Sequence, residues 1–444
     1  MSAPPPPTTT DLSGRRIVIA NWRDPWHPEA GGAERYAWEL ARGLVARGAS
    51  VCYLTARAPG QARRGRHDQI TVVRMGGRFT VYPLVLGWLL AHRRSFDAVL
   101  DCQNGIPFFT PWVLPRRVPV LCLMHHVHTA QFGVHFPRWM ARAGQVLEGP
   151  VARRAYRRHA CVAISPSTVT AMRERLRWTG DIYLVPPGAP APRADPASPG
   201  PRSLSWVGRL VAHKRAELIL PVAQRLMGSG FTIDVVGRGP AAEPLAAAVA
   251  AGGLAGAVHL HGFLSEGDKE AVVARSLLHL STSQGEGWGI CVLEAAALGV
   301  PTVAYDVDGL RDAVRDGRTG WLVRAGETIE DVTERAIKEL ADPVRRDAIA
   351  AACRDWAARL DWERCRERMA ALIEGSVRYG SSRSRHPGAW IVSGAGQQSP
   401  HGVLAEGPVL DALLAAHPDG LALRPATPLE RLLGRSAGDD GDLP

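Results

Sequence analysis

Short apolar runs alternate with amphipathic stretches through the first half of the chain. The run RRIVIAN at 15–21 is typical of a buried strand, and from Gly32 apolar side chains recur every three or four residues, which predicts a helix. Gly48 ends that helix, and SVCYLT at 50–55 is a second strand. This βαβ pattern predicts a parallel sheet. Further candidate strands are ITVVRM, FDAVLDC, VPVLCLMHH, ACVAIS and IYLVP.

The pattern stops at 186–202, where proline, glycine and alanine dominate as they do in linkers, and then it starts again. SLSWVG, FTIDVVG, AVHLHG, LLHLS and PTVAY are predicted strands, separated by helices that begin near 216, 241, 266 and 289. We therefore expect an α/β protein with two doubly wound, Rossmann-like domains.

These patterns give the following domain boundaries: a disordered lead at 1–13, an N-terminal domain at 14–190, a C-terminal domain at 191–360, a closing helix at 361–379 and a mostly irregular, low-complexity tail at 380–444. Within the tail, 409–416 is the one candidate for a docking helix.

The composition is that of a globular protein, with 46% hydrophobic and 22% charged residues. No apolar run approaches the roughly 18–20 residues of a membrane-spanning helix, and the first residues lack the pattern of a signal peptide. The seven cysteines are scattered without a C-x-x-C motif, which favours free thiols in a reducing cytoplasm.

Charge is distributed unevenly. Residues 1–190 contain 25 arginines, no lysine and 11 acidic residues, giving +14, and the remainder carries −4. A basic first half indicates an anionic partner, for which phosphate groups, a membrane surface and nucleic acid are candidates. Nucleic acid is disfavoured, because the chain has no recognisable module and no aromatic residues interleaved with the basic ones.

Two cations follow the first strand of the second half. In WVGRLVAHKR, Arg209 comes directly after the strand and Lys214 precedes the next helix. Ligands of open α/β sheets bind at the carboxyl ends of strands, where these two cations could clamp a diphosphate. The competing interpretation is a pair of solvated surface cations.

The strongest motif is SQGEGWGICVLEAAALGVP at 283–301. A glycine-rich loop at a helix N-terminus favours an anion, and Glu286 in the loop could accept hydrogen bonds from sugar hydroxyls. Glu294 lies among apolar and small residues, so we expect a nearly buried carboxylate that needs a partner, such as a ribose diol.

Two weaker motifs lie in the first half. Gly31 and Gly32 open a helix and could bring backbone N–H groups to an anion, although a tight turn would serve as well. LCLMHHVH places His125, His126 and His128 at a strand end. The histidines have no acidic or cysteine ligand nearby, so contact with a polar ligand, or simple packing, is favoured over metal binding.

Together these motifs resemble those of the retaining GT-B glycosyltransferases of family 4. Glu286 and Glu294 are similar to that family's E-x7-E motif, and Gly208, Arg209 and Lys214 to its diphosphate grip. GGAER at 31–35, SPS at 165–167, VPPGA at 185–189, VVGRGP at 235–240 and HGF at 261–263 occur in the family's order, so the resemblance covers about residues 15–378.

The resemblance implies transfer of a sugar from a nucleotide-diphospho-sugar, with the donor on the C-terminal domain and the acceptor on the N-terminal domain. Arg209 and Lys214 would neutralise the leaving diphosphate, Glu294 would hold the ribose, and Glu286 with the loop Gly287–Trp288–Gly289 would position the sugar. His125 would contact the sugar near the anomeric centre or its 6-hydroxyl, Gly31 and Gly32 would line the donor site, and the backbone near Gly262 and Phe263 would read the base.

No metal or other cofactor is expected, because Asp306-Val307-Asp308 lies where the family places no metal. The chain departs from the family at VPPGA and at Arg215, where glycine is usual. The alternative function is an inactive relative that binds nucleotide or sugar.

The favoured acceptor is lipid-linked or part of a cell-envelope glycan, which would place the protein peripherally on the inner face of the membrane. VYPLVLGWLLAHRR at 81–94 joins an apolar segment to two arginines, and PVARRAYRRHA at 150–160 would form a basic helical face. The alternative is a core helix with solvated arginines and an enzyme acting on a small soluble acceptor.

Overall fold

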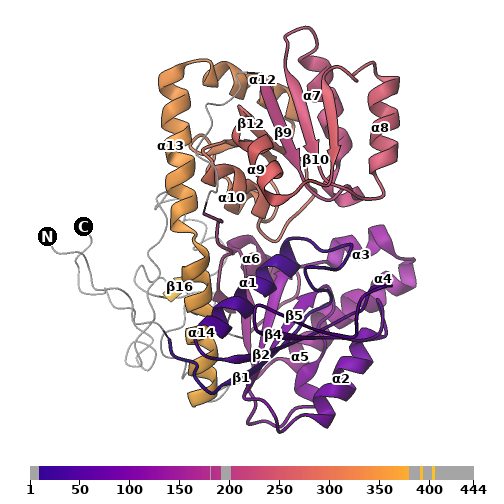
Figure 1. The fold of residues 1–444 in the computed structure, drawn as a ribbon, viewed down its shortest axis with the longest axis vertical. Coiled ribbons are helices and arrows are strands. Elements are labelled where there is room, and N and C mark those ends of the chain that lie inside the picture. The colour runs from indigo at the N-terminus through magenta and orange to yellow at the C-terminus, as the bar shows by residue number, and fades with distance from the viewer. Residues whose placement is uncertain (1–9, 181, 192–201, 380–390, 394–402, 406–444) are drawn as a thin grey trace, which may run out of the picture. The chain divides into compact units, whose positions relative to one another are not determined.

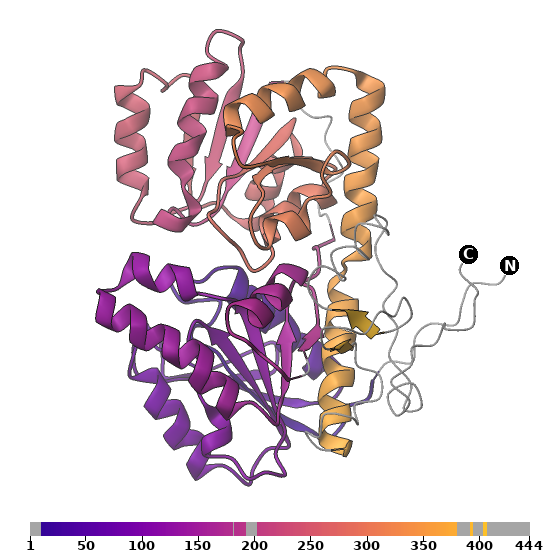
Figure 2. The same cartoon turned by 180° about the vertical axis from the view of Figure 1, so that it is seen from behind.

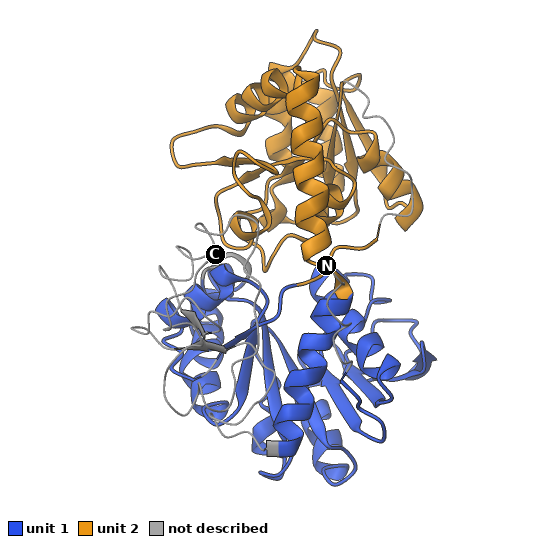
Figure 3. Ribbon diagram, turned by 90° about the vertical axis from the view of Figure 1, so that its left-hand side faces the viewer, with its two compact units in different colours: residues 1–186, 363–417, 421–444 blue, residues 187–362, 418–420 orange. Residues whose placement is uncertain are grey.

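The computed structural model describes residues 10–180, 182–191, 202–379, 391–393 and 403–405. The chain divides into two compact units (Figure 3): among the described residues, unit 1 holds those up to 186 and those from 363 onward, and unit 2 holds those between 187 and 362. The candidate helix at 409–416 and residues 1–9 of the lead lie outside the described residues. Within the rest of that lead, Leu12 is fully buried and Thr10 N–H donates to Glu367.

Unit 1 is built on a sheet whose strands run in the order β8-β7-β6-β5-β1-β2-β4-β3, and β15 and β16 extend it beyond β8. The strands β1, β2 and β4 to β8 are parallel to one another. At one edge β3 is antiparallel to β4, and at the other β15 is antiparallel to β8 and parallel to β16. The strands are β1 (Arg16–Ala20), β2 (Ser50–Thr55), β3 (Arg64–His67), β4 (Ile70–Arg74), β5 (Ala98–Asn104), β6 (Val120–His126), β7 (Ala160–Ala163), β8 (Ile182–Leu184), β15 (Ile391–Ser393) and β16 (Val403–Ala405).

Helices cover both faces of this sheet (Figures 1 and 2). They are α1 (Gly32–Ala46), α2 (Val81–Ala91), the 3₁₀ turn η1 (Thr110–Trp112), α3 (Thr129–His135), α4 (Arg138–Val146), the π-helix η2 (Leu147–Val151), α5 (Ala152–Ala155), α6 (Pro166–Glu174) and α14 (Trp362–Tyr379). Strands β5 and β6 are buried almost throughout, as expected of parallel strands covered on two sides.

Unit 2 contains six parallel strands in the order β11-β10-β9-β12-β13-β14. They are β9 (Ser203–Val207), β10 (Thr232–Val236), β11 (Val258–Gly262), β12 (Leu278–Ser281), β13 (Thr302–Tyr305) and β14 (Gly320–Val323). The helices are η3 (Ala212–Lys214), η4 (Ala216–Leu218), α7 (Ile219–Arg225), α8 (Ala242–Ala251), α9 (Glu266–Ala274), α10 (Ile290–Ala297), α11 (Leu310–Ala313), α12 (Ile329–Leu340) and α13 (Pro343–Arg359). The expected α/β class with two doubly wound sheets is confirmed.

The predicted basic helical face at 150–160 is wrong. Pro150 lies inside η2, and α5 ends at Ala155, so Arg157 and Arg158 follow the helix instead of extending it. Arg153 Nη1 donates to the carbonyl of Leu176 at 3.0 Å, which ties it to the segment that follows α6. The periodicity of the arginines indicated a helix that proline and tertiary contacts interrupt.

Candidate active site

The two motifs of unit 2 meet because β9 and β12 are neighbours in the sheet. Leu280 of β12 pairs with Trp206 of β9, so the loops that follow these parallel strands leave the same sheet edge side by side. Gln284 N–H donates to the carbonyl of His213 at 2.9 Å, and Thr282 Oγ1 donates to the carbonyl of Lys214 at 2.7 Å. The turn at Lys214 and the glycine-rich loop are therefore joined by hydrogen bonds.

Lys214 and Glu286 form an ion pair between Nζ and Oε1. Their side chains are only 15% and 16% exposed, and Ser283 Oγ donates to the same carboxylate oxygen at 2.6 Å. Burial alone would raise the pKa of the Glu286 carboxyl, but the Lys214 ammonium and the hydrogen bond from Ser283 outweigh it and lower that pKa. Glu286 is therefore ionised at neutral pH.

Arg215 holds the same loop from the other side. Its Nε donates to the carbonyl of Thr282 at 2.9 Å and its Nη2 to that of Ser283 at 3.2 Å, while the guanidinium lies 4.4 Å from the ring centroid of Tyr305. Its φ of 47° is in the left-handed region. Glycine adopts that conformation without strain, so the arginine accepts backbone strain and anchors the loop through its side chain.

Glu294, on α10, is paired with Lys269 of α9. The distance from Lys269 Nζ to Glu294 Oε2 is 3.1 Å, and the two side chains are 16% and 13% exposed. The nearly buried Glu294 carboxylate thus has the partner that it was expected to need, and this partner is Lys269 of the chain itself. The sequence motifs did not predict this pairing. Burial would lower the pKa of Lys269, but Glu294 and then Glu266 outweigh it and raise it.

The Cys291 thiol, in the first turn of α10, is influenced by the charges of both ion pairs. Burial is the main reason that its pKa rises to about 11, and the charges of Lys214, Glu286, Glu294 and Lys269 all act on it. One uncharged side chain therefore lies within electrostatic reach of both pairs, so the two carboxylates belong to one region of unit 2.

The loop between β12 and α10 has the close backbone packing that its glycines permit. Glu286 N–H donates to the carbonyl of Asp308 at 3.0 Å, and a Cβ at Gly309 would lie 2.4 Å from the Glu286 carbonyl oxygen. Gly289, which precedes α10, has a φ of 96°. Trp288 is buried and Gly287 is half-buried, so the loop is a fixed element on which the backbone N–H groups keep their directions.

The remaining predicted donor-site residues of unit 2 lie at the ends of β9 and β11. Arg209 is half-buried and directly follows Gly208. Gly262 ends β11 with a φ of 68°, and Phe263 is 68% exposed with the Arg238 guanidinium 4.6 Å from its ring centroid. All of them are at the carboxyl edge of the sheet.

In unit 1, His125 lies near the end of β6 and is buried. Its ring meets Tyr36 edge-on, with the centroids 5.5 Å apart, and neither ring nitrogen has a hydrogen-bond partner among the described residues. Burial, and then the nearby His128, lower the pKa of His125 to about 3, so its imidazole is neutral. A neutral ring with unpaired nitrogens is suited to a polar ligand.

Gly31 and Gly32 begin α1. The Gly31 N–H donates to the buried Glu34 carboxylate at 2.7 Å, as in a capping box. The Gly31 N–H therefore already has a hydrogen-bond acceptor within the chain. An anion bound at this helix N-terminus would lie beside the Glu34 carboxylate.

His126 ends β6, and His128 follows it and precedes α3. The buried Glu148 of η2 accepts a hydrogen bond from His128 N–H at 2.5 Å, which fixes the loop. Over the described ranges, no cluster of three or more His, Cys, Asp or Glu side chains could hold a metal ion. The helices in those ranges also include none long and apolar enough to cross a membrane.

Two family models match adjacent parts of the chain: "Glycosyltransferase Family 4" over residues 30–191 and "Glycosyl transferases group 1" over 192–356. A glycogen synthase of Pseudomonas syringae pv. syringae is 32% identical over 179 residues, 40% of this chain and 36% of the relative. The alpha-D-kanosaminyltransferase of Streptomyces kanamyceticus is 34% identical over 149 residues, 33% of this chain and 38% of the relative. The chain thus spans little more than a third of these relatives.

Longer matches are more distant. A D-inositol 3-phosphate glycosyltransferase of Nocardiopsis dassonvillei is 25% identical over 388 residues, 76% of this chain and 87% of the relative. Among solved structures, sucrose-phosphate synthase of Thermosynechococcus elongatus has a TM-score of 0.68 at 19% identity, covering 81% of this chain and 98% of that one. HepE of Anabaena in complex with UDP-glucose has a TM-score of 0.62 at 18% identity, covering 81% and 99%. These structures share the GT-B fold with this chain.

Proposed function

The chain belongs to glycosyltransferase family 4, and on that premise we propose that it transfers a sugar from a nucleotide-diphospho-sugar to an acceptor hydroxyl with retention at the anomeric carbon. The acceptor oxygen bonds to the anomeric carbon as the bond from that carbon to the diphosphate breaks. The hydroxyl proton leaves with the nucleoside diphosphate. The observation that carries the proposal is the ion pair of Lys214 with Glu286 at the carboxyl edge of unit 2.

Lys214 would act on the leaving group. An ammonium has three N–H donors, and the Glu286 carboxylate needs one of them, so others can reach phosphate oxygens. Arg209 would add a second, forked donor. Negative charge grows on the diphosphate as the glycosidic bond breaks, so these cations stabilise the transition state more than the ground state. We propose that the two fixed cations supply the charge that a divalent ion supplies elsewhere, so that transfer is independent of metal.

Glu286 and Glu294 would position the donor. Glu294 is held by Lys269 and keeps acceptor capacity for the ribose hydroxyls, since an ionised carboxylate offers about four lone-pair sites. Glu286, with the N–H groups of Trp288 and Gly289, would hold the sugar. His125, Gly31 and Gly32 of unit 1 remain predicted contacts to the donor, as do Gly262 and Phe263 near the base.

The test is release of nucleoside diphosphate from a panel of nucleotide-sugars, beginning with UDP-glucose because HepE was solved with it. Each donor is assayed with and without acceptors. We expect one donor to be hydrolysed slowly alone and faster with an acceptor. Tight binding of a donor with neither hydrolysis nor transfer would instead support the alternative, an inactive relative.

For the acceptor, we propose a lipid-linked or cell-envelope substrate and peripheral contact with an anionic membrane. Phe79, Leu84 and Leu90, in and next to α2, are 58%, 47% and 46% exposed. Arg93 and Arg94 follow the same helix and are exposed. Val81, Val85 and Leu89 of α2 are buried. The helix therefore also packs into the core of unit 1, as the alternative interpretation of this segment predicts.

Sedimentation with phosphatidylglycerol vesicles tests this contact. Binding should occur at low salt and weaken as salt screens the arginines. A protein that stays in the supernatant and ignores lipid acceptors would be an enzyme of small soluble acceptors instead.

A further inference from the structure

A cavity of about 550 Å³ lies in unit 1 between α3 and α4. Small-molecule sites have volumes in this range, roughly 300–1,000 Å³. Both helices follow β6, so the cavity lies on the side of the sheet where the parallel strands end, which is where ligands of open α/β sheets bind. Its lining consists of Gly133, Phe136, Arg138, Ala141, Arg142, Gln145 and Val146.

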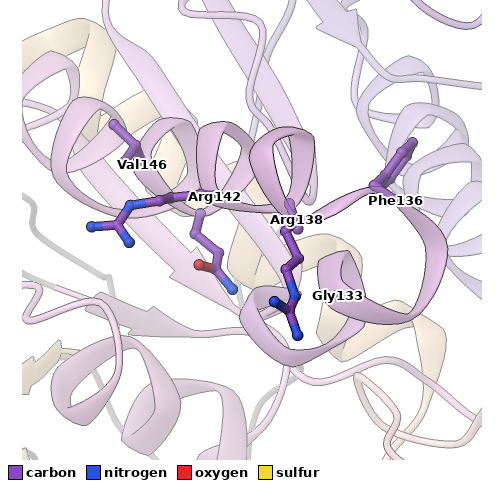
Figure 4. A pocket seen from close by; sticks show the side chains of 7 residues that line it. Gly133, Phe136, Arg138, Arg142 and Val146 are labelled. Atoms are coloured by element: carbon purple, nitrogen blue, oxygen red, sulfur yellow. The ribbon is translucent and has the colours of Figure 1, made fainter.

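Two arginines dominate the polar part of this lining. Arg138 and Arg142 are one helical turn apart on α4, and Arg138 extends toward the turn that contains Gly133 (Figure 4). Both are exposed, and neither guanidinium makes a hydrogen bond or an ion pair with another described residue. Like charges one turn apart repel, so α4 carries an electrostatic cost that an anion between them would remove.

The neighbouring stretch of chain does not neutralise this charge. Residues 129–146 contain no aspartate or glutamate. The next acidic residue, Glu148, is fully buried, and its carboxylate accepts hydrogen bonds from His128 N–H and, at 3.0 Å, from Thr129 Oγ1. The one acidic group close in sequence therefore holds the loop after β6 and not the arginines.

A third cation lies beside the cavity. The Arg78 guanidinium, from the loop between β4 and α2, is 5.4 Å from the ring centroid of Phe136, which lines the cavity. It is also 5.9 Å from the centroid of Trp22, which follows β1. Aromatic faces hold a guanidinium in place without neutralising it. Three loops that follow the strands β1, β4 and β6 thus bring cationic and aromatic groups together.

We propose that this cavity binds a phosphate group of the acceptor, with Arg138 and Arg142 as its ligands and Arg78 adding to the positive field. Guanidinium groups match phosphate oxygens with two parallel hydrogen bonds, and two of them suit a dianion. Phe136 and Val146 would contact the apolar face of the group that carries the phosphate. The inference rests on the proposed transferase function and adds the chemical class of its acceptor.

The experiment compares the wild type with the double variant Arg138→Gln/Arg142→Gln and with the control Arg116→Gln/Arg117→Gln. The control arginines are also adjacent and exposed, but they precede β6 at the opposite end of that strand. Acceptors are offered in two arms: sugar and polyol monophosphates, including D-inositol 3-phosphate, and polyprenyl phosphates in detergent. Each is paired with its dephosphorylated counterpart, and donor hydrolysis without acceptor is measured for all three proteins.

We expect phosphorylated acceptors to be preferred in one arm, and that arm identifies whether the phosphate is soluble or lipid-borne. The double variant should raise the acceptor KM ten- to a hundredfold, with donor KM and acceptor-free hydrolysis within twofold of wild type. Equal use of dephosphorylated acceptors in both arms, or a KM that rises no more than in the control, would overturn the inference. Absence of any donor binding or hydrolysis by the wild type would overturn the proposed function itself.

Discussion

Replacing Lys214 by methionine keeps most of the side-chain volume and removes the ammonium that pairs with Glu286. If Lys214 stabilises the leaving diphosphate, the variant loses a charge-assisted contact that is strongest in the transition state. Such contacts contribute about 2–4 kcal/mol to the barrier, so kcat should fall roughly 10²- to 10³-fold. The fold should persist, because the Thr282 and His213 hydrogen bonds of this turn use backbone carbonyls.

The same substitution is also expected to change how activity and stability depend on pH. In the wild type the pKa of Glu286 is lowered despite burial, and Lys214 is the largest of the groups that lower it. A carboxyl with a depressed folded pKa stabilises the protein above its unfolded pKa and loses that contribution as pH falls through the folded value. Without Lys214, burial dominates and the folded pKa rises. The variant should therefore lose its residual activity at a higher pH than the wild type does. Its Glu286 should no longer add stability at neutral pH, and the contribution of that carboxyl to stability should instead be present at low pH and be lost as pH rises through the raised folded pKa.

The assay is steady-state release of nucleoside diphosphate between pH 4 and pH 8, with thermal unfolding followed in parallel. Lys338→Met is the matched control, because Lys338 is a 73% exposed lysine on α12 that pairs with Glu334. It should leave both profiles unchanged. A Lys214→Met protein that folds normally and turns over near the wild-type rate would refute the role of Lys214. If the activity of Lys214→Met fell with decreasing pH over the same range as that of the wild type, the electrostatic explanation of the Glu286 pKa would be refuted.

Three further predictions concern the same region. Glu294→Ala should reduce turnover about 10²- to 10³-fold with an unchanged circular dichroism spectrum, because its carboxylate would serve the ligand; near-normal activity would contradict this. Excess chelator should leave turnover unchanged, and activity that disappears and returns with magnesium or manganese would show that the two cations are insufficient. Arg215→Gly should relieve backbone strain at a φ of 47° but release the loop at Thr282 and Ser283, so the donor KM should rise while thermal stability changes little; an unchanged KM would mean that the arginine does not position the loop.

The sequence predicted the strands well because parallel strands buried on both faces are continuous apolar runs. FDAVLDC and VPVLCLMHH became β5 and β6, whose side chains are almost all buried. The π-helix at Leu147–Val151 and the early end of α5 at Ala155 could not be predicted in the same way. The arginine spacing there fits a helix, and the π-helix with Pro150 depends on tertiary packing that a periodicity does not report.

At the site, the residue types were visible but their partners were not. Lys214 and Glu286 are 72 positions apart, and they meet only because β12 inserts beside β9 in the sheet. Lys269 lies in a stretch of α9 rich in charged residues, which has the composition of a solvated helix, and its pairing with Glu294 requires the packing of two helices. The left-handed backbone conformation of Arg215 is likewise set by the turn in which it lies. In the sequence, the one indication of this conformation was that the family usually has glycine at the position of Arg215.

Unit 2 is inserted into unit 1, since the chain leaves unit 1 after Pro186 and returns at Glu363. The two ends of the insertion are neighbours: Ala189 N–H donates to the carbonyl of Leu360, and Ala189 forms a bridge with Asp361. A Cβ at Gly188 would lie 2.2 Å from Trp362 N, so only glycine fits there. A single proteolytic cut at one crossing would therefore split the chain in two, but it would leave unit 2 covalently joined to one part of unit 1 through the other crossing. An excised unit 2 would begin and end at nearly the same point, which makes it a natural candidate for separate expression or for circular permutation.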